Sequence, residues 1–282
     1  YHFHQFPTSF LLTNFIAVPV SSMILIGEIL LCAISFIPFL ATMVGKMLSA
    51  LIWFMNTYIE RIETIRFSLW DSLYIDLPQM ILLIFFGACI AAWLMEKWKP
   101  GLKIGLLSLL FFTISRTYSF VKANEQQKII VYNVPQKRAI DFVNGRNYVF
   151  KGDSDLLVEG FARNFHLKPS RILYRMEATK SLSNFLSKEN YINYLGKNII
   201  LIDSTIVFAA QDLKPKVDLL VISKNPRIYM NQLASSLDIK QVVFDGSVPA
   251  WKANYWKKDC DSLKIPWWDV TVKGAFVMDV NY

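Results

Sequence analysis

The sequence predicts an α-helical membrane segment followed by a layered α/β domain, on three observations. Apolar residues make up 54% of the 282 residues, more than soluble domains usually carry, so membrane spans are expected. Only 7 of the 30 basic and 6 of the 22 acidic residues fall within residues 1–120, which leaves a net charge of +7 to the remainder. Strand and helix patterns alternate in that remainder, which is long enough to bury a core. We therefore expect a membrane part over 1–124 and a soluble domain over 125–282.

Three stretches are apolar enough to cross a membrane, for which about 20 residues are needed. Residues 10–40 contain one charge, Glu28, and two prolines, Pro19 and Pro38, which favour kinks or helix ends. This run fits one steeply tilted helix, or a short membrane-dipping piece before Pro19 followed by a span. Residues 77–95 carry no charge. Residues 102–121 carry Lys103 and Arg116 near the ends, where long side chains reach the interface.

Residues 48–65 show an amphipathic pattern between the first and second spans. Leu48, Leu51, Ile52 and Met55 begin an apolar series at helical spacing, and polar residues fall on the other side. The pattern is typical of a helix on the membrane surface, and it fits a helix packed within the protein equally well.

Charge predicts the orientation of the membrane part. The short segment 96–103 contains Lys97, Lys99 and Lys103, and positive loops favour the cytoplasmic side. We therefore expect the soluble domain to lie outside the cytoplasm. Glu28 is the ionisable group deep in an apolar run, and such a residue lines a pore or couples transport, or else contacts another span or lies near an interface.

The N-terminus predicts that more of the protein precedes this chain. Tyr1 does not resemble a start residue, and the first residues lack the basic region and cleavage site of a signal peptide. We expect the preceding part of the same protein to contain further membrane spans.

The soluble half is predicted to open with a strand and a hairpin. Asn144 and Gly145 form the strongest short hairpin signal, because a type I′ turn needs two residues with positive φ. β-branched and apolar runs predict the strands, and helical spacing of apolar residues predicts the helices. The expected strands are 128–134, 139–143, 146–150, 198–202, 217–222, 241–244, 269–272 and 275–280, and the expected helices are 153–165, 180–195, a segment ending at 237, and 250–263.

Several short motifs of the chain resemble those of one known family, the ComEC-type competence proteins. Residues 133–139 read NVPQKRA where the C-terminal domain of that family reads DVGQGDA, and residues 14–19 read NFIAVP where its membrane domain reads NLLAIP. Asp203 ends a strand as the aspartate of the family's LTGD motif does, and residues 218–222 read DLLVI before a loop at 223–226. The Gly274-Ala275 pair resembles the family's closing strand.

The resemblance implies a bacterial inner-membrane channel that takes up single-stranded DNA in natural transformation, and it makes the outer side on which we expect the soluble domain the periplasmic face. It implies a metallo-β-lactamase-like fold for the soluble domain, with the lipid bilayer, single-stranded DNA, other competence proteins and the preceding part of the same protein as partners. A soluble domain in such a channel acts as a scaffold or guides DNA, and a membrane-surface module for protein interaction is an alternative.

The chain lacks the histidines that a paired zinc centre of that fold requires. Its three histidines are His2, His4 and His166, and the usual His-x-His-x-Asp-His run is absent. We therefore predict that the metal site is lost, and that the chain has no metal, no cofactor and no enzymatic activity. The alternative is a nuclease with a rearranged site, for example Mg²⁺ on Asp153, Asp155 and Asp203.

Basic residues supply the DNA-binding candidates of the soluble domain. Single-stranded nucleic acid is held by basic grooves with aromatic stacking platforms, and residues 251–258 combine both kinds of side chain through Trp251, Tyr255 and Trp256. Ordinary surface charge, or contact with an anionic bilayer, would give the same pattern. The candidate DNA-binding residues are Lys137, Arg138, Arg146, Lys224, Arg227, Lys257 and Lys258.

Overall fold

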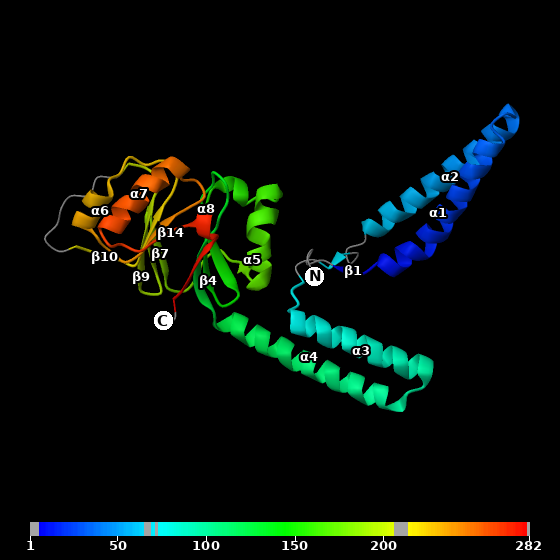
Figure 1. The fold of residues 1–282 in the computed structure, drawn as a ribbon, viewed down its shortest axis with the longest axis horizontal. Helices are drawn as coiled ribbons and strands as arrows, with labels where there is room; N and C mark the ends of the chain where they lie inside the picture. The colour runs from blue at the N-terminus through cyan, green and yellow to red at the C-terminus, as the bar shows by residue number, and fades with distance from the viewer. Residues whose placement is uncertain (1–5, 65–68, 71–72, 206–213, 281–282) are drawn as a thin grey trace. The chain divides into compact units, whose positions relative to one another are not determined.

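The computed structural model describes residues 6–64, 69–70, 73–205 and 214–280. The chain divides into two compact units, residues 1–75 and 76–282, which Figure 1 shows as ribbons. Apolar helices dominate the first unit, while the second contains two further apolar helices and a mixed α/β domain. The predicted fold class, membrane helices followed by an α/β domain, is therefore confirmed.

The first unit is a helical hairpin closed by a small antiparallel pair of strands. Helices α1 (Phe10–Ala33) and α2 (Pro38–Glu63) form the hairpin, and β1 (Phe6–Pro7) pairs with β2 (Leu69–Trp70). Helix α1 runs through Pro19, so the alternative that divided the chain there is wrong, and so is a single helix over 10–40. Pro38 instead begins helix α2. The first turn of a helix accepts proline because the backbone N–H groups there have no partner within the helix.

Helix α2 includes most of the segment 48–65, which was predicted to be a separate amphipathic helix. It begins ten residues earlier, at Pro38, and its 26 residues are long and apolar enough to cross a membrane. The described residues therefore contain four candidate spans, where three were predicted. Ile65, the last residue of the predicted amphipathic pattern, lies outside the described residues.

The second unit begins with a tight hairpin of α3 (Leu77–Glu96) and α4 (Lys99–Glu125). Its seam carries small residues, so that the backbones approach closely. A Cβ added to Gly101 would lie 2.8 Å from the Cys89 carbonyl oxygen, and the Ser108 hydroxyl donates a 2.8 Å hydrogen bond to the Leu82 carbonyl. These two helices correspond to the predicted spans over 77–95 and 102–121.

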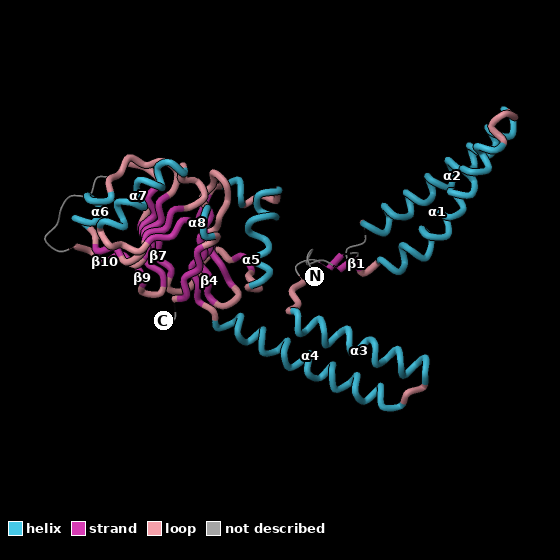
Figure 2. Tube along the Cα trace, in the orientation of Figure 1, coloured by secondary structure: helices cyan, strands magenta, loops and turns pink. Residues whose placement is uncertain are grey.

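The soluble domain contains two sheets, visible as two groups of magenta strands in Figure 2. One has the order β15-β3-β4-β5-β6, with β4 at its centre, and the other has the order β14-β13-β11-β9-β8-β7. The strands of the first sheet are β3 (Gln127–Val131), β4 (Ala139–Asn144), β5 (Asn147–Gly152), β6 (Glu177–Ala178) and β15 (Phe276–Asp279). Those of the second are β7 (Phe185–Lys188), β8 (Tyr191–Tyr194), β9 (Lys197–Ile202), β11 (Leu219–Ile222), β13 (Val242–Phe244) and β14 (Trp267–Asp269). The pair β10 (Lys216–Val217) and β12 (Asp238–Ile239) lies apart from both.

Three apolar cores arrange the domain in four layers. One core lies between the sheets and contains Ile129, Phe142 and Leu219. A second lies under α6 (Met230–Ser236) and α7 (Ala250–Ser262), on the six-stranded sheet. The third lies under the 3₁₀-helix η1 (Ser154–Leu156), the π-helix η2 (Arg163–Leu167) and α5 (Lys168–Leu173). The layered α/β architecture is confirmed, while its likeness to metallo-β-lactamases stays a prediction.

Most predicted strands are present, including the hairpin at Asn144 and Gly145, where Gly145 has φ 59°. The helix predicted over 180–195 is wrong, because this segment forms the β7–β8 hairpin. Ile192 and Tyr194 are buried at a period of two, and Asn184 and Glu189 adopt positive φ, which interrupts a helix.

Two further predictions fail locally. The helix over 153–165 is wrong as a single element, because η1 ends at Leu156 and the apolar residues Leu157, Val158 and Phe161 that follow it are exposed. The strand over 269–272 is also wrong beyond Asp269. That side chain accepts the Thr271 backbone N–H and begins the short helix α8 (Val270–Lys273).

A buried ion pair fixes α5 on the five-stranded sheet. Asp141 of β4 is fully buried, and Arg171 donates to its two carboxylate oxygens at 2.9 and 3.0 Å. The Tyr132 hydroxyl donates a third bond of 2.8 Å, and the guanidinium lies 4.4 Å from the centre of the Tyr148 ring. Burial by itself lowers the pKa of Arg171, but the hydrogen bonds and charge of Asp141 raise it, so the arginine stays ionised.

Replacing Arg171 by Met should lower the free energy of unfolding of the soluble domain by about 3–5 kcal/mol, because Asp141 is left buried without its cation. The double variant Asp141→Leu/Arg171→Met should recover most of that loss, since no buried charge remains. The measurement is urea unfolding of the detergent-solubilised chain, followed by near-ultraviolet circular dichroism. The control Lys240→Met, at the exposed pair with Asp218, should leave the midpoint nearly unchanged. A double variant as unstable as the single one would contradict the argument.

Candidate nucleic-acid interface

Three polar residues follow parallel strands at one edge of the six-stranded sheet, which we call the carboxyl edge. Strands β9, β11 and β13 are parallel, and they lead directly into Asp203, Ser223 and Asp245. The carboxyl ends of parallel strands meet at one edge of a sheet, which is where α/β proteins generally bind ligands.

Two basic side chains converge on Asp203 at this edge. Arg138, from the loop between β3 and β4 of the other sheet, donates from Nη1 to Asp203 Oδ2 at 3.0 Å. Lys224 Nζ lies 3.9 Å from the same oxygen. Lys224 has φ 60°, an uncommon conformation for a side-chain-bearing residue, and its backbone N–H donates to the Ser247 hydroxyl at 2.6 Å. The carboxyl edge therefore carries a fixed cluster of two cations around one carboxylate.

Gly246 connects the loops of the two sheets at the carboxyl edge. The Gly246 carbonyl accepts the Gln136 N–H at 2.8 Å, and a Cβ at position 246 would lie 2.3 Å from the Val134 carbonyl oxygen. No side chain fits there. This contact brings Arg138, which follows Val134 in the same loop, within reach of Asp203.

Asp245 is fully buried beneath the cluster and accepts three hydrogen bonds. The donors are the Ser223 hydroxyl and both the hydroxyl and the backbone N–H of Ser247. Burial raises the pKa of Asp245 to about 6, against the lowering effect of these donors and of the Arg138 charge. Gly246 and Ser247 thus form a structural turn before α7, whose N-cap residue is Pro249.

The carboxylates that could hold a rearranged metal site already have cationic or N–H partners. Asp153 accepts the Arg138 backbone N–H at 3.0 Å, and Asp155 lies 3.1 Å from Lys137 Nζ. Asp203 is held by Arg138, as above. Within the described residues no group of three or more His, Cys, Asp and Glu side chains is placed to hold a metal ion. His166 packs against the Phe165 ring, His2 and His4 lie outside the described residues, and this donor set does not fit a paired metal centre.

The structure brings some of the candidate DNA-binding residues together and separates others. Lys137, Arg138, Lys224 and the exposed Arg227 lie in the loops of the carboxyl edge. Arg146 instead follows the β4–β5 turn, at the opposite end of β4, and pairs with Glu177.

The two candidates on α7 have different surroundings. Lys257 pairs with Asp269 and lies 5.4 Å from the centre of the Trp267 ring, so its charge is already engaged. Lys258 is exposed on α7.

Two exposed aromatic residues extend the carboxyl edge onto α7. Trp251 and Tyr255 are 60% and 64% exposed, and their ring centres lie 6.4 Å apart. Trp256, which the sequence grouped with them, is buried and stacks on Phe244. Sequence reasoning missed Lys252, which donates to Asn225 at 2.7 Å and connects α7 to the basic loop. That contact joins residues 27 positions apart, so no local sequence pattern predicts it.

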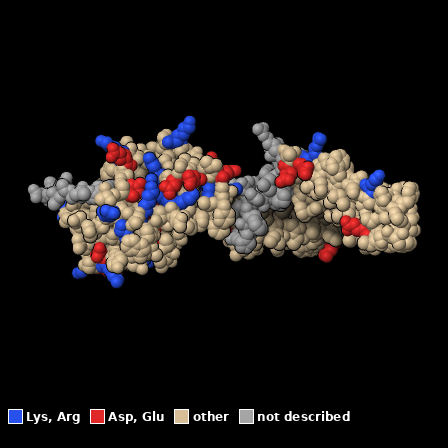
Figure 3. All heavy atoms as spheres, turned by 90° about the horizontal axis from the view of Figure 1, so that it is seen from above, with Lys and Arg blue, Asp and Glu red and all other residues tan. Residues whose placement is uncertain are grey.

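Charges of both signs mingle on the surface of the soluble domain. Figure 3 shows Lys and Arg interspersed with Asp and Glu on the visible face of this domain, while the atoms of the apolar helices are mostly uncharged. The visible face therefore shows no extended surface of one charge.

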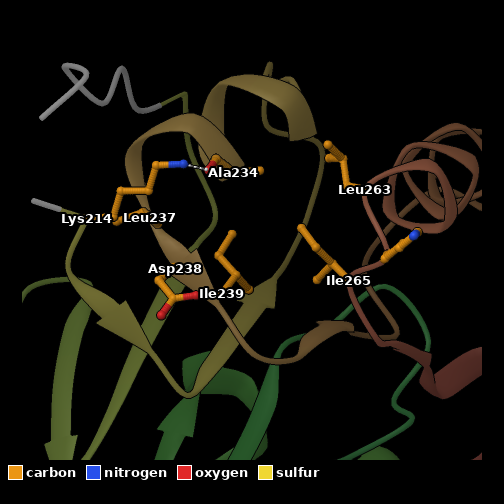
Figure 4. Close-up of a pocket in the computed structure, with 8 residues that line it drawn as sticks. Lys214, Ala234, Leu237, Asp238, Ile239, Leu263 and Ile265 are labelled. Carbon is orange, nitrogen blue, oxygen red and sulfur yellow. Dashed lines mark hydrogen bonds between the residues drawn. The ribbon is translucent and has the colours of Figure 1, made fainter. Parts of the chain in front are cut away.

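The pocket drawn in Figure 4 lies at the opposite, amino edge of the sheet, next to β10 and β12. Its volume is about 590 Å³, and Lys214 closes one side by donating to the Ala234 carbonyl at 2.8 Å. The remaining lining residues include Leu237, Ile239 and Ile265. None of the candidate DNA-binding residues lines it.

Glu28 lies in α1, whose other 23 residues carry no charge. Its side chain is exposed on the helical hairpin of the first unit. The structure thus presents an ionisable group on an otherwise apolar helix surface.

The free energy of unfolding should fall as pH rises from about 4 to about 6, because Asp245 keeps its proton in the folded state and releases it in the unfolded state. The full effect is about 3 kcal/mol, and stability should level off above pH 6. The difference between wild type and Asp245→Asn isolates this slope, measured from thermal unfolding in detergent at each pH. Ser247→Ala removes a donor to the carboxylate and should extend the falling range to higher pH. Identical slopes in wild type and Asp245→Asn would contradict this assignment.

Comparison with protein families identifies the chain. Residues 129–280 match the family described as ComEC C-terminal domain, and residues 1–99 match the family described as Competence protein. No curated protein and no solved structure matches the chain. The first match covers more than half of the 282 residues, and the order of the two matches agrees with apolar helices followed by an α/β domain. The chain is a membrane protein with a role in DNA uptake, and it belongs to the ComEC-type competence protein family.

Proposed function

We propose that the chain forms part of an inner-membrane channel for single-stranded DNA, and that its soluble domain guides DNA without cleaving it. The observation that carries the proposal is the convergence of Arg138 and Lys224 on Asp203. A carboxylate engaged by two cations is poorly available to a divalent metal, whereas the surrounding basic loops attract phosphate.

The carboxyl edge combines the two features that single-stranded DNA requires. Lys224, Arg227 and Lys252 supply positive charge, and Trp251 and Tyr255 supply exposed rings on which bases can stack. Lys252 connects the two groups by its bond to Asn225. A strand held by its phosphates along the loop would therefore present its bases to α7.

The membrane helices support a periplasmic position for the domain. Helices α3 and α4 are joined through Lys97 and Trp98, and positive residues in such a turn favour the cytoplasm. The end of α4 then lies outside, and β3 begins two residues after it. Arg138 lies at the far end of β4 from this junction, about 20 Å away along a six-residue strand. The carboxyl edge is thus directed away from the bilayer, where arriving DNA is found.

Glu28 is proposed to face either the DNA pathway or another membrane segment. A carboxylate on a lipid-facing surface is costly, and such groups in spans generally face a wet cavity or a protein partner. Its exposure on α1 supports a position that the remainder of the channel covers.

The interaction-module alternative has one specific observation in its favour. Leu157, Val158, Phe161 and Phe165 are between 61% and 80% exposed, and the rings of the last two stack 5.4 Å apart. Exposed apolar groups of this kind are typical of protein contacts. Other competence proteins are the partners that this surface suggests.

Binding of a labelled single-stranded oligonucleotide to the chain in neutral-lipid nanodiscs should weaken steeply with salt. Each of Lys224→Gln and Arg227→Gln should reduce the slope of log affinity against log salt by about 0.7, because one phosphate contact is lost. Trp251→Ala/Tyr255→Ala should instead weaken binding at every salt concentration, by about 1–3 kcal/mol per stacked base, with an unchanged slope.

The matched controls are Lys264→Gln, beside the pocket at the amino edge of the sheet, and Tyr118→Ala on α4, both with exposed side chains. Neither should alter the affinity or the slope. Wild-type binding that does not depend on salt would reject the DNA-guiding role and favour the interaction module.

Asp203→Asn should leave transformation frequency within a few-fold of wild type, because the proposed role of Asp203 is to hold Arg138 and not a metal. Deletion of the gene should abolish transformation. The nuclease alternative predicts the opposite for Asp203→Asn. Cleavage of labelled DNA by the purified chain with Zn²⁺, Mn²⁺ or Mg²⁺, lost in Asp203→Asn, would establish that alternative.

A further inference from the structure

Three arginine side chains surround the Phe120 ring near the end of α4. The guanidinium carbons of Arg175, Arg116 and Arg146 lie 4.2, 5.1 and 5.6 Å from the centre of the ring. We call these three residues the arginine collar. Three guanidinium groups therefore gather around one aromatic ring.

The collar is assembled from three separate parts of the chain. Arg116 belongs to α4, Arg146 follows the β4–β5 turn, and Arg175 follows α5. Arg175 donates to the Ser119 hydroxyl at 3.1 Å, and Arg146 Nε donates to the Arg175 carbonyl at 3.4 Å. These bonds place the guanidinium groups on the last turns of α4.

Gln126 fixes the surrounding loops at the same place. Its amide donates to the Gly145 carbonyl at 2.9 Å and to the Tyr174 carbonyl at 2.7 Å. The residues next to those carbonyls are Arg146 and Arg175, so the collar is held in position by the backbone rather than by charge alone.

The α3–α4 hairpin places the collar at the level of lipid headgroups. Gln79, in the first turn of α3, donates to the Ser115 hydroxyl at 3.3 Å, so the apolar part of the hairpin ends near Ser115 and Arg116. The Arg116 guanidinium extends one turn onward to Phe120, as a snorkelling side chain does. Long basic side chains near the ends of spans generally reach the lipid headgroups in this way.

Further charged groups of both signs lie around the collar. Arg146 pairs with the exposed Glu177, and Lys128 pairs with Asp279. Asp76 interacts electrostatically with Arg116 across the hairpin. Lys122, exposed on α4, adds another positive charge beside these groups.

We propose that the arginine collar binds the phosphate groups of anionic phospholipids and docks the soluble domain on the bilayer surface. Planar guanidinium groups bind phosphate oxygens in pairs, and basic residues beside a span attract anionic lipid headgroups. This interaction is separate from DNA guidance, because the collar and the carboxyl edge lie at opposite ends of β4.

The test measures the affinity of the full chain in phosphatidylcholine nanodiscs for a fluorescent phosphatidylglycerol analogue. Arg146→Gln/Arg175→Gln should weaken binding about 30-fold, since each basic residue at a membrane surface contributes about fivefold. Arg146→Lys/Arg175→Lys keeps both charges and should retain most of the affinity. The matched control Arg163→Gln/Arg227→Gln changes the same charge elsewhere and should leave lipid affinity unchanged.

Several outcomes would overturn the lipid assignment. One is a wild-type chain without preference for phosphatidylglycerol over phosphatidylcholine, and another is unchanged affinity in Arg146→Gln/Arg175→Gln. Displacement of the lipid by millimolar inorganic phosphate would show a site for small anions instead. Equal loss in the Lys and Gln double variants would show a purely structural junction. Loss of oligonucleotide binding with intact lipid binding would assign the collar to DNA.

Discussion

The buried pair of Asp141 and Arg171 anchors the strand whose two ends lead to both proposed functional regions of the soluble domain. Asp141 is in the middle of β4, the central strand of its sheet, and Arg171 attaches the outer helical layer to that strand. One end of β4 begins immediately after Arg138, and the other leads into the turn before Arg146. A strand anchored at its centre thus presents one arginine to the carboxyl edge and another to the end of α4.

At the carboxyl edge, side chains of the protein itself engage the carboxylates. Asp203, Ser223 and Asp245 occupy the ends of parallel strands, a location suited to ligands. Arg138 engages the exposed carboxylate, and serine hydroxyl groups satisfy the buried one. Each acidic group therefore has a partner from the protein itself, and what the edge offers to the outside is positive charge.

The sequence was most informative where local pattern and packing agree. Apolar runs predicted three helices that could span a membrane, and Asn144-Gly145 predicted the hairpin beside Arg146. It failed over residues 180–195, because pairing of β8 with β9 overrides the local preference. It also failed at Asp269, where a side chain that caps α8 ends the strand.

The site was only partly predictable, because its contacts join distant segments. Lys137, Arg138, Lys224 and Arg227 could be named as basic candidates. The meeting of Arg138 with Asp203 spans 65 residues, and Lys252 reaches Asn225 across 27. Neither contact leaves a periodic signal. The proximity of Arg116 to Arg175 could not be predicted for the same reason, since only the folded chain places both side chains on the Phe120 ring.

The close approach of Gly246 to Val134 has a consequence for how this surface can diverge among related proteins. Position 246 has no room for a side chain, so the contact between the loops of the two sheets tolerates no substitution of this glycine. Lys224 and Arg227 lie in the adjoining loop with exposed side chains, where substitution costs the scaffold little. Selection can therefore change the exposed basic residues of the carboxyl edge one at a time, while the contact between the two sheets beneath them is preserved.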